Sequence, residues 1–537
     1  MIRRSRLLLA VSAAVLLPAT ASAETLNVGL GSEPTAVDPH YHDLGPNNAM
    51  VEHIFEALVA HDKDLKIVPE LATEWERRDD NTWVFTLREG VTFSNGEPFT
   101  AKDVIFTLCR VLNNETGQGS FTDVASNTES LVAEGETTLV VTTKVPEPLL
   151  LAELTDIPIL SSSIVEHGEL TFDPANGCGV TGAWPTVEQF NDGSVAIGTG
   201  PYALEDYTKG DSITLSANET YWGEAPAFET VVFTAVPSDG PRLAGLLAGD
   251  YDLIENPAPR DLPRIEENPN LDYVVTPSNR VIFLQMDTYR DVGESPTLEA
   301  EGENPFKDVR VRRAISKAID RDAIVERIMD GVATPAYQYL PDSMFGALPE
   351  PPVLEYDPEE AKRLLAEAGY PDGFKVTLAT PNDRYINDER VAQAVAQFLA
   401  RIGIDASVDA MSRSVFFPKR RERAFSMSMA GWGSSTGEAS SFLRAFVVTE
   451  DPERDVGGSN YGGYTSEKFD TVFLPAIESM DEAEREQGLM DSMKVALEEM
   501  PLIPLHYESS TWAFRDGISY PGRADQATIV MDVEVEG

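Results

Sequence analysis

The residue best suited to ligand chemistry is an arginine in a short loop. Arg384 lies in the segment 381–387, which directly follows an expected strand, Phe374 to Thr380. A guanidinium group can grip a carboxylate through two parallel hydrogen bonds. In open α/β sheets, ligands bind beyond the carboxyl ends of the strands. The sequence therefore predicts that Arg384 binds the ligand; an exposed loop arginine with no ligand is the alternative.

A second loop in an equivalent position carries an aromatic ring and polar groups. The segment 431–442 follows an expected strand, Phe425 to Gly431, and contains Trp432 and Glu438. Trp432 can form the apolar wall of a pocket, and core packing is its alternative role. We expect both loops to lie at the ligand-binding edge of one sheet.

The same loop also matches a hydrolase motif. The segment 433–437 fits G-x-S-x-G with Ser435 as its serine, and Asp470 and His506 follow in the order of a serine hydrolase. However, the match lies in a run of small residues, and no Gly-rich oxyanion motif precedes it. Such short motifs recur by chance. We therefore expect a binding protein with no catalytic residues, and a secreted serine hydrolase is the alternative.

No cofactor or resident metal is expected. Of the six histidines, only His40 and His42 are close in sequence, and two histidines without cysteine support make a weak metal motif. The pairs Gly29-x-Gly31 and Gly198-x-Gly200 lack the third glycine and the following helix of a nucleotide-binding loop. We therefore expect no ATP site on this chain.

The first 23 residues have the pattern of an export signal. A basic start with Arg3, Arg4 and Arg6 precedes an apolar run from Leu7 to Leu17, and Ala21-Ser22-Ala23 fits a signal-peptidase site. The apolar run is shorter than the roughly 20 residues that span a bilayer. We expect an exported soluble protein that begins at Glu24. The secretory route is favoured over twin-arginine export, because Arg6 stands where that signal prefers an aromatic residue.

Length and charge limit the function classes. The 537 residues exceed what one core usually holds, so two or three compact units are expected. The net charge of −47 becomes −50 when the three leader arginines are removed, since 39 basic residues then face 89 acidic ones. A chain this negative is not expected to bind nucleic acid, and its attraction to anionic lipid is disfavoured as well.

Two cysteines, Cys109 and Cys178, form an even set in an exported chain. They predict a disulfide, and two buried thiols are the alternative. Because 178 − 109 = 69 residues are enclosed, the bond would stabilise the fold by roughly 4 kcal/mol in the loop-entropy model. Two cysteines this far apart make neither a thiolate metal site nor a redox CxxC motif.

Several segments have clear secondary-structure patterns. Thr100 is expected to cap a helix that runs to Arg110. Tyr202 to Leu215 alternates between apolar and polar residues and is predicted to be a strand that crosses back to the first lobe, in a stretch where Gly210 and Asp211 punctuate two strand-like runs. The glycines before it, Gly198 and Gly200, are expected to supply special backbone angles. Arg280 to Asp287 is predicted to cross a hinge, and strands alternate with helices from 374 to 431, which indicates a largely parallel sheet.

Short blocks in a fixed order resemble a known family. They include Pro69 to Trp75 (P-x-L-A-x-x-W), a following L-R-x-G-V-x-F-x-x-G block at 87–96, Gly198-Thr199-Gly200-Pro201-Tyr202, and the exit at 249–252 (G-x-x-D). Together these blocks resemble the peptide/nickel, or family 5, periplasmic solute-binding proteins of ABC importers. The resemblance covers nearly the whole chain after the leader.

The resemblance implies an α/β fold of the type II periplasmic-binding-protein kind. It implies two lobes joined by a hinge, with an extra small α+β lobe beside them. The expected boundaries are 1–23 for the signal peptide, 24–61 with 198–287 and 501–537 for lobe I, 62–197 for lobe II, and 288–500 for lobe III.

The resemblance also implies a set of site residues. In dipeptide-binding relatives, an arginine followed by a tyrosine holds the ligand's carboxylate, and Arg384-Tyr385 matches this motif. The loop at 431–442 stands where relatives carry G-W-x-x-D-x-x-D-P-D-x-F. Ser435 replaces the first aspartate, which in relatives pairs with the ligand's amino group, and Glu438 is a candidate substitute. The predicted ligand-binding set is Ser32, Arg384, Tyr385, Trp432, Gly433, Ser435, Glu438, Asn460 and Tyr461.

The implied function is that of a periplasmic receptor that closes on its solute without altering it. It would deliver a peptide or similar small solute to ABC permease subunits in the inner membrane, and ATP hydrolysis would belong to other subunits. A sugar or a metal chelate is the alternative ligand, since nickel binders belong to the same broad family. We expect a monomer that contains no cofactor.

Overall fold

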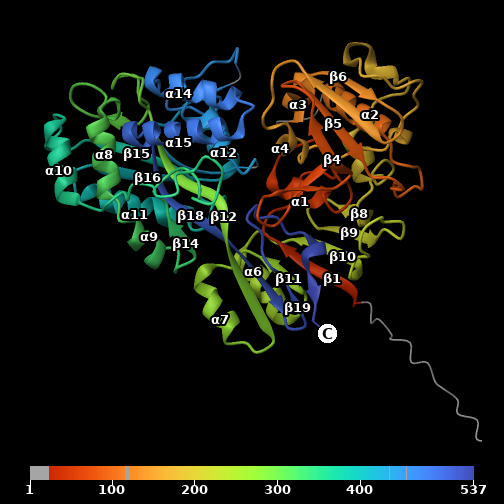
Figure 1. The fold of residues 1–537 in the computed structure, drawn as a ribbon. Coiled ribbons are helices and arrows are strands. Elements are labelled where there is room, and N and C mark those ends of the chain that lie inside the picture. Colours follow the sequence, from red (N-terminus) through yellow and green to blue (C-terminus); the bar gives the residue numbers. More distant parts are fainter. Residues whose placement is uncertain (1–22, 115–120, 435, 455, 537) are drawn as a thin grey trace, which may run out of the picture.

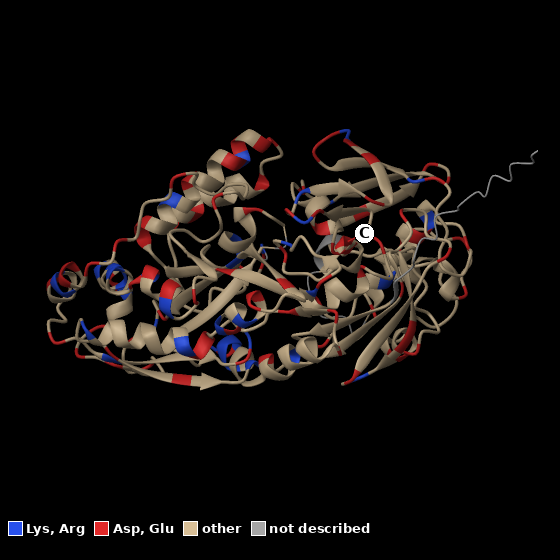
Figure 2. Ribbon diagram, turned by 90° about the horizontal axis from the view of Figure 1, so that it is seen from below, with Lys and Arg blue, Asp and Glu red and all other residues tan. Residues whose placement is uncertain are grey.

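A computed structural model describes residues 23–114, 121–434, 436–454 and 456–536. Two bodies lie side by side and are joined below by long strands (Figure 1). Figure 2 shows acidic residues spread over helices and loops of both bodies rather than gathered in one patch. Among the described residues, no helix combines the length and the apolar character needed to cross a membrane.

Two long strands join the bodies. β12 (Leu271–Met286) pairs antiparallel with β18 (Leu502–Arg515) from one end to the other. On one side β12 also pairs with β17 (Met427–Gly433), and on the other side β18 pairs with β11 (Leu253–Glu255). A single sheet of 12 strands therefore runs through both bodies. The predicted hinge strand from Arg280 to Asp287 thus corresponds to the last part of β12, which ends at Met286.

Lobe III is the body built around β15 (Lys375–Pro381), β16 (Asp405–Met411) and β17. These strands are parallel, as the alternation of strands and helices predicts. β13 (Leu298–Glu299) and β14 (Ala333–Pro335) add short antiparallel edges. The helices are α8 (Val309–Ala318), α9 (Arg321–Arg327), α10 (Pro358–Glu367), α11 (Asp388–Ala400), α12 (Arg413–Arg421), α13 (Ala439–Phe446), α14 (Glu467–Glu478) and α15 (Glu482–Glu499). They enclose two buried apolar clusters.

Lobe I forms the other end of the same sheet. β1 (Ala23–Leu30) lies between β10 (Phe228–Ala235) and β11, parallel to both. β10 continues to β9 (Ser212–Ala217) and β8 (Tyr202–Thr208). The accompanying helices are α1 (Gly45–Val51), α5 (Val187–Asn191), α6 (Asp239–Ala248) and α7 (Leu262–Glu266), and β19 (Ile518–Ser519) pairs with β20 (Glu534–Val535).

Lobe II has its own sheet and core. Its strands follow the order β4 (Ala72–Arg77), β5 (Thr82–Leu87), β7 (Thr138–Thr143), β6 (Thr128–Ala133). The helices α2 (Ala101–Asn113), α3 (Phe121–Asn127) and α4 (Leu150–Leu154) accompany it, and β2 (Val59–His61) pairs with β3 (Ile67–Pro69) nearby. Thr100 caps α2 with a capping box, as predicted. The predicted disulfide between Cys109 and Cys178 is also confirmed.

The prediction that 202–215 crosses between lobes is wrong. This segment forms the antiparallel hairpin of β8 and β9 at the outer edge of the sheet, because the turn at Gly210 (φ 82°) folds it back on itself. The structure also gives a different reason for glycine at position 198 than the special backbone angles that were predicted. An added Cβ there would lie 1.9 Å from the carbonyl oxygen of Ile54. Gly198 is therefore required by a close backbone approach and not by a positive φ.

Candidate functional site

A cavity with a volume of about 850 Å³ lies between lobes I and III. Its lobe III wall is formed by residues 382–390 with Arg413 and Phe417. Ser32 and Glu33 belong to the lobe I wall, and Arg280 and Glu508 come from the two joining strands. The cavity therefore opens where the lobes face each other, next to the strands that join them.

Arg384 projects from a loop whose backbone is fixed. β15 ends at Pro381 and α11 begins at Asp388, whose carboxylate accepts hydrogen bonds from the backbone N–H groups of Arg384 and Tyr385, both at 3.1 Å. The Arg384 side chain is exposed, and its Cζ lies 5.2 Å from the centre of the Tyr385 ring. Within the described chain, its guanidinium forms no hydrogen bond and no ion pair. Arg384 is therefore available to an anionic ligand.

Tyr385 is the support beneath Arg384. Its ring is buried, and its hydroxyl donates to the carbonyl oxygen of Gly431 at 3.1 Å. A Cβ at Gly431 would lie 2.8 Å from the Tyr385 ring, so glycine in β17 makes room for it. The Arg384-Tyr385 motif therefore places a buried, hydrogen-bonded ring next to a guanidinium that has no partner among the described residues.

Arg280 reaches the same cavity from β12. Its Nε donates to Oε1 of Gln526 at 2.7 Å and lies 3.6 Å from Oε2 of Glu508 in β18. The other oxygen of Glu508 accepts from the backbone N–H of Ile386 at 2.8 Å. Burial, together with the nearby charge of Arg384, lowers the pKa of Arg280 to about 10, and Glu508 opposes this shift. Two like charges therefore face one cavity.

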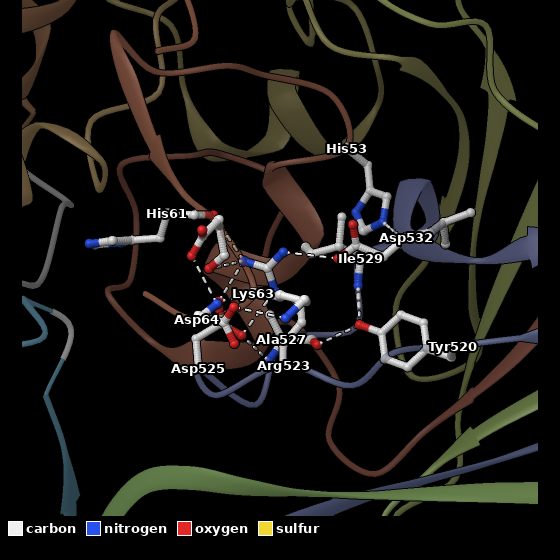
Figure 3. A network of polar contacts seen from close by, with 12 residues as sticks. His53, His61, Lys63, Asp64, Tyr520, Arg523, Asp525, Ala527, Ile529 and Asp532 are labelled. Carbon is white, nitrogen blue, oxygen red and sulfur yellow. Dashed lines mark hydrogen bonds and ion pairs between the residues drawn. The ribbon is translucent and has the colours of Figure 1, made fainter. Parts of the chain in front are cut away.

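The segment that carries Gln526 is held against lobe I by the polar network of Figure 3. Arg523 forms ion pairs with Asp525 at 2.6 Å and Asp532 at 2.9 Å, and donates to the carbonyl oxygen of His61 at 3.1 Å. His53 accepts from the backbone N–H of Val530 through Nε2 at 3.0 Å. The network fixes the backbone of this part of the cavity wall.

One hydrogen bond crosses the cavity between the lobes. Nη1 of Arg413, at the start of α12, donates to Oγ of Ser32 at 3.2 Å, and the backbone N–H of Arg413 donates to Asp383 at 2.6 Å. Ser32 follows Gly31, whose N–H is held by Glu255 at 2.8 Å. The structure therefore brings Ser32, Arg384 and Tyr385 of the predicted set to one cavity.

Other predicted residues lie elsewhere in lobe III and do not line this cavity. The Trp432 ring packs edge-on against Phe446 at 5.2 Å, because α13 turns back over the end of β17. Gly433 pairs with Arg280 in the sheet. A Cβ at Gly433 would lie 2.7 Å from the side-chain oxygen of Asn279. Both residues therefore have packing roles in the structure.

The polar residues of the predicted ligand-binding set also contact other parts of the protein instead of the cavity. Glu438 is buried and forms an ion pair with Arg485 at 3.1 Å. Asn460 is buried and binds the carbonyl oxygen of Tyr464 at 2.8 Å. The ring of Tyr461 lies 5.1 Å from the Cζ of Arg420. Ser435 lies outside the described residues.

The described residues do not assemble the hydrolase or metal alternatives. His506 is buried in β18, and neither ring nitrogen has a hydrogen-bond partner within the described chain. Asp470 accepts from the backbone N–H of Thr449 at 3.1 Å. His40 is bound by Arg110 and by a backbone carbonyl, whereas His42 contacts Thr35. Among the described residues, no group of three or more His, Cys, Asp or Glu side chains is placed to hold a metal.

Four polar or charged residues of the cavity, among others, were not predicted from the sequence. Arg413 follows β16 and so obeys the same strand-end rule as Arg384, which would have identified it. Arg280 follows Ser278 and Asn279, and Glu508 precedes Ser509 and Ser510, so no contrast with apolar neighbours singles them out in the sequence. Gln526 has no signal in the sequence either, because its place depends on the network around Arg523.

Comparison with known proteins identifies the family. The model of the bacterial extracellular solute-binding proteins, family 5 (middle), matches residues 66–452. The chain belongs to this family. Its members are solute-binding components of ABC importers and not enzymes. The type II two-lobe fold expected from the sequence is confirmed.

Individual relatives differ in what they bind. The glutathione-binding protein GsiB of Salmonella typhi is 27% identical over 91% of this chain and 90% of its own length. Heme-binding protein A of Haemophilus influenzae is 26% identical over 85% and 82%. The periplasmic binding protein DppA of Helicobacter pylori, solved with the peptide STSA, superposes with a TM-score of 0.76 at 23% identity and covers 96% of this chain and 98% of its own. The last likeness concerns the fold alone.

Proposed function

We propose that this solute-binding protein takes up a peptide-like solute with a free carboxylate in the cavity between lobes I and III. The observation that carries the proposal is the free guanidinium of Arg384 above the buried ring of Tyr385, inside a cavity of about 850 Å³. This volume lies within the range of about 300–1,000 Å³ that is usual for small-molecule sites. The glutathione-binding relative supports the same ligand class.

In this proposal the chain works as a receptor in the periplasm, exported by the segment 1–23 and acting as a monomer. The ligand draws lobe III towards lobe I, and the hydrogen bond between Arg413 and Ser32 contributes to the closed form. An ABC permease then takes the solute from the closed receptor. Ser32, Arg384 and Tyr385 are the ligand-binding residues of this proposal.

Titration calorimetry with peptides of two to five residues, each as free acid and C-terminal amide, tests the proposal. We expect the free acids to bind and the amides to bind at least about tenfold more weakly, because a charge-assisted bidentate hydrogen bond is lost. Arg384→Gln should remove this difference. Arg401→Gln is the matched control, since Arg401 directly follows α11 and does not line the cavity. Equal binding of acids and amides, or a response only to sugars or metal chelates, contradicts the proposal.

A further inference from the structure

The acidic and basic groups around the cavity differ in how many partners they have within the protein. Eight carboxylates and five guanidinium groups line it. Each of the eight carboxylates has a hydrogen-bond or ion-pair partner within the protein. Asp388, for example, accepts from two backbone N–H groups of the Arg384 loop. Each acidic group is therefore already engaged at least once within the protein.

The arginines differ from one another in this respect. Arg242 is committed to three backbone carbonyl oxygens at 2.5 to 2.8 Å. Arg390 and Arg413 each bind a neutral side chain, Asn387 and Ser32 respectively. Among the described residues, Arg384 keeps all of its donors, whereas Arg280, Arg390 and Arg413 each use one. Of these three, Arg280 is the one that uses Nε and so keeps both terminal nitrogens, and it is also the one that is partly buried rather than exposed. Within the described chain, Arg384 has no polar partner for its guanidinium, and Arg280 donates only through Nε.

Arg280 is a usable anion-binding group despite its acidic neighbour. Its Nε lies 3.6 Å from Glu508, which is too long for a hydrogen bond. Its two terminal nitrogens make no hydrogen bond with the described residues, and its side chain keeps 17% of its surface exposed at the cavity. A guanidinium edge with two free N–H₂ groups matches the two oxygens of a carboxylate.

Arg280 and Arg384 also repel each other across the cavity. They come from different elements, β12 and the loop after β15, and both line the same cavity. Such repulsion is unfavourable in a partly desolvated site until anionic groups enter it. A solute with one negative charge offsets only part of the repulsion between the two arginines. A solute with two negative charges can pair with both guanidinium groups.

We infer that the cavity selects solutes that carry two carboxylates, with Arg384 binding one and Arg280 the other. Arg280 is then the residue that determines specificity, and Gln526 is the neutral group that holds its Nε in place. This inference rests on the proposed function, because it concerns the same cavity. It narrows the ligand class to acidic peptides and comparable dicarboxylates.

Matched ligand pairs test the inference by calorimetry. The pairs are Ala-Glu with Ala-Gln, Glu-Ala with Gln-Ala, and the non-peptides glutarate with glutaramate. Each pair differs in one carboxylate and keeps its size. We expect the wild type to bind the more acidic member of at least one peptide pair about tenfold or more tightly.

Variants assign the preference to a residue. Arg280→Gln should reduce it to within about twofold and leave the affinity for the amide member nearly unchanged. Arg280→Lys keeps the charge and should retain part of the preference, which separates ligand binding from a purely structural role. Arg384→Gln should weaken both members of a pair alike, and Arg401→Gln should change neither.

The outcomes separate this inference from the proposed function. Equal binding of the members of every pair by the wild type overturns the inference and leaves the proposed function standing. A preference that persists in folded Arg280→Gln overturns the role of Arg280. If only the glutarate pair binds, the peptide class of the proposed function fails while a preference for glutarate supports the inference. If no ligand of the three pairs binds, both fail.

Discussion

A buried ion pair between lobes I and II is a sensitive point of this structure. Arg110 of α2 and Asp38 of the loop after β1 approach to 2.5 Å, and their side chains are 1% and 0% exposed. Arg110 also binds Nδ1 of His40 at 3.0 Å and lies 4.7 Å from the centre of the Phe190 ring. The loop that contains Asp38 spans residues 31–44 and includes Ser32 on the cavity wall, so this pair anchors the middle of that loop.

Asp38→Asn tests the importance of the pair. Removing one charge leaves Arg110 buried without a counter-charge, a change that costs about 3–5 kcal/mol in other buried pairs. Because asparagine keeps an acceptor oxygen and His40 still contacts Arg110, we expect a loss near the lower end, about 3 kcal/mol. Removing both charges with Asp38→Asn and Arg110→Met should restore most of this stability, since no uncompensated charge then remains buried.

Chemical denaturation followed by tryptophan fluorescence measures the loss, and hydrogen exchange of the α2 amides shows whether it is local to lobe II. Asp64→Asn is the matched control, because Asp64 forms an exposed pair with Lys63 and should leave stability unchanged. A loss below about 1 kcal/mol for Asp38→Asn, or a double variant less stable than the single one, refutes the reasoning.

Two further predictions concern acid stability and backbone packing. Burial lowers the pKa of His53 to about 4, so the unfolded chain takes up its proton first. The stability gained by keeping His53 neutral in the folded state is therefore lost as pH falls from about 6.5 towards 4. In urea unfolding, the free energy of unfolding of His53→Gln should fall less over that pH range than that of the wild type. Gly198→Ala places a methyl group against a carbonyl oxygen and should cost about 1–3 kcal/mol or more, whereas Gly240→Ala, in open space, should not destabilise the fold in thermal unfolding.

The fold was largely predictable because its signals are local. The alternation of strands and helices from 374 to 431 identified the parallel strands, and Thr100 identified the start of α2. The hairpin of β8 and β9 was mistaken for a crossing strand, because the alternation of 202–215 is the same in both cases. Only the partners of a strand distinguish an edge hairpin from a strand that joins two lobes, and pairing is not a local property.

The cavity was predictable only in part, for a related physical reason. Ligands of open α/β sheets bind beyond the carboxyl ends of the strands, and this rule pointed to the loops after β15 and β17. The loop after β15 reaches the cavity because Asp388 holds its backbone and Tyr385 is buried beneath Arg384. The ring of Trp432, after β17, instead packs against Phe446 of α13. A chain position at a strand end does not reveal which aromatic neighbours will compete for a side chain.

The strands that join the lobes have a double role in this structure. β12 and β18 connect the two bodies, and they also place Arg280 and Glu508 at the cavity. Rotation of lobe III about these strands would carry Arg384 through a larger displacement than Arg280, which lies beside the pivot. A dicarboxylate bound first at Arg280 could then meet Arg384 as the lobes close. Closure would thus depend on the second carboxylate, which links the selection of the solute to the conformation offered to the permease.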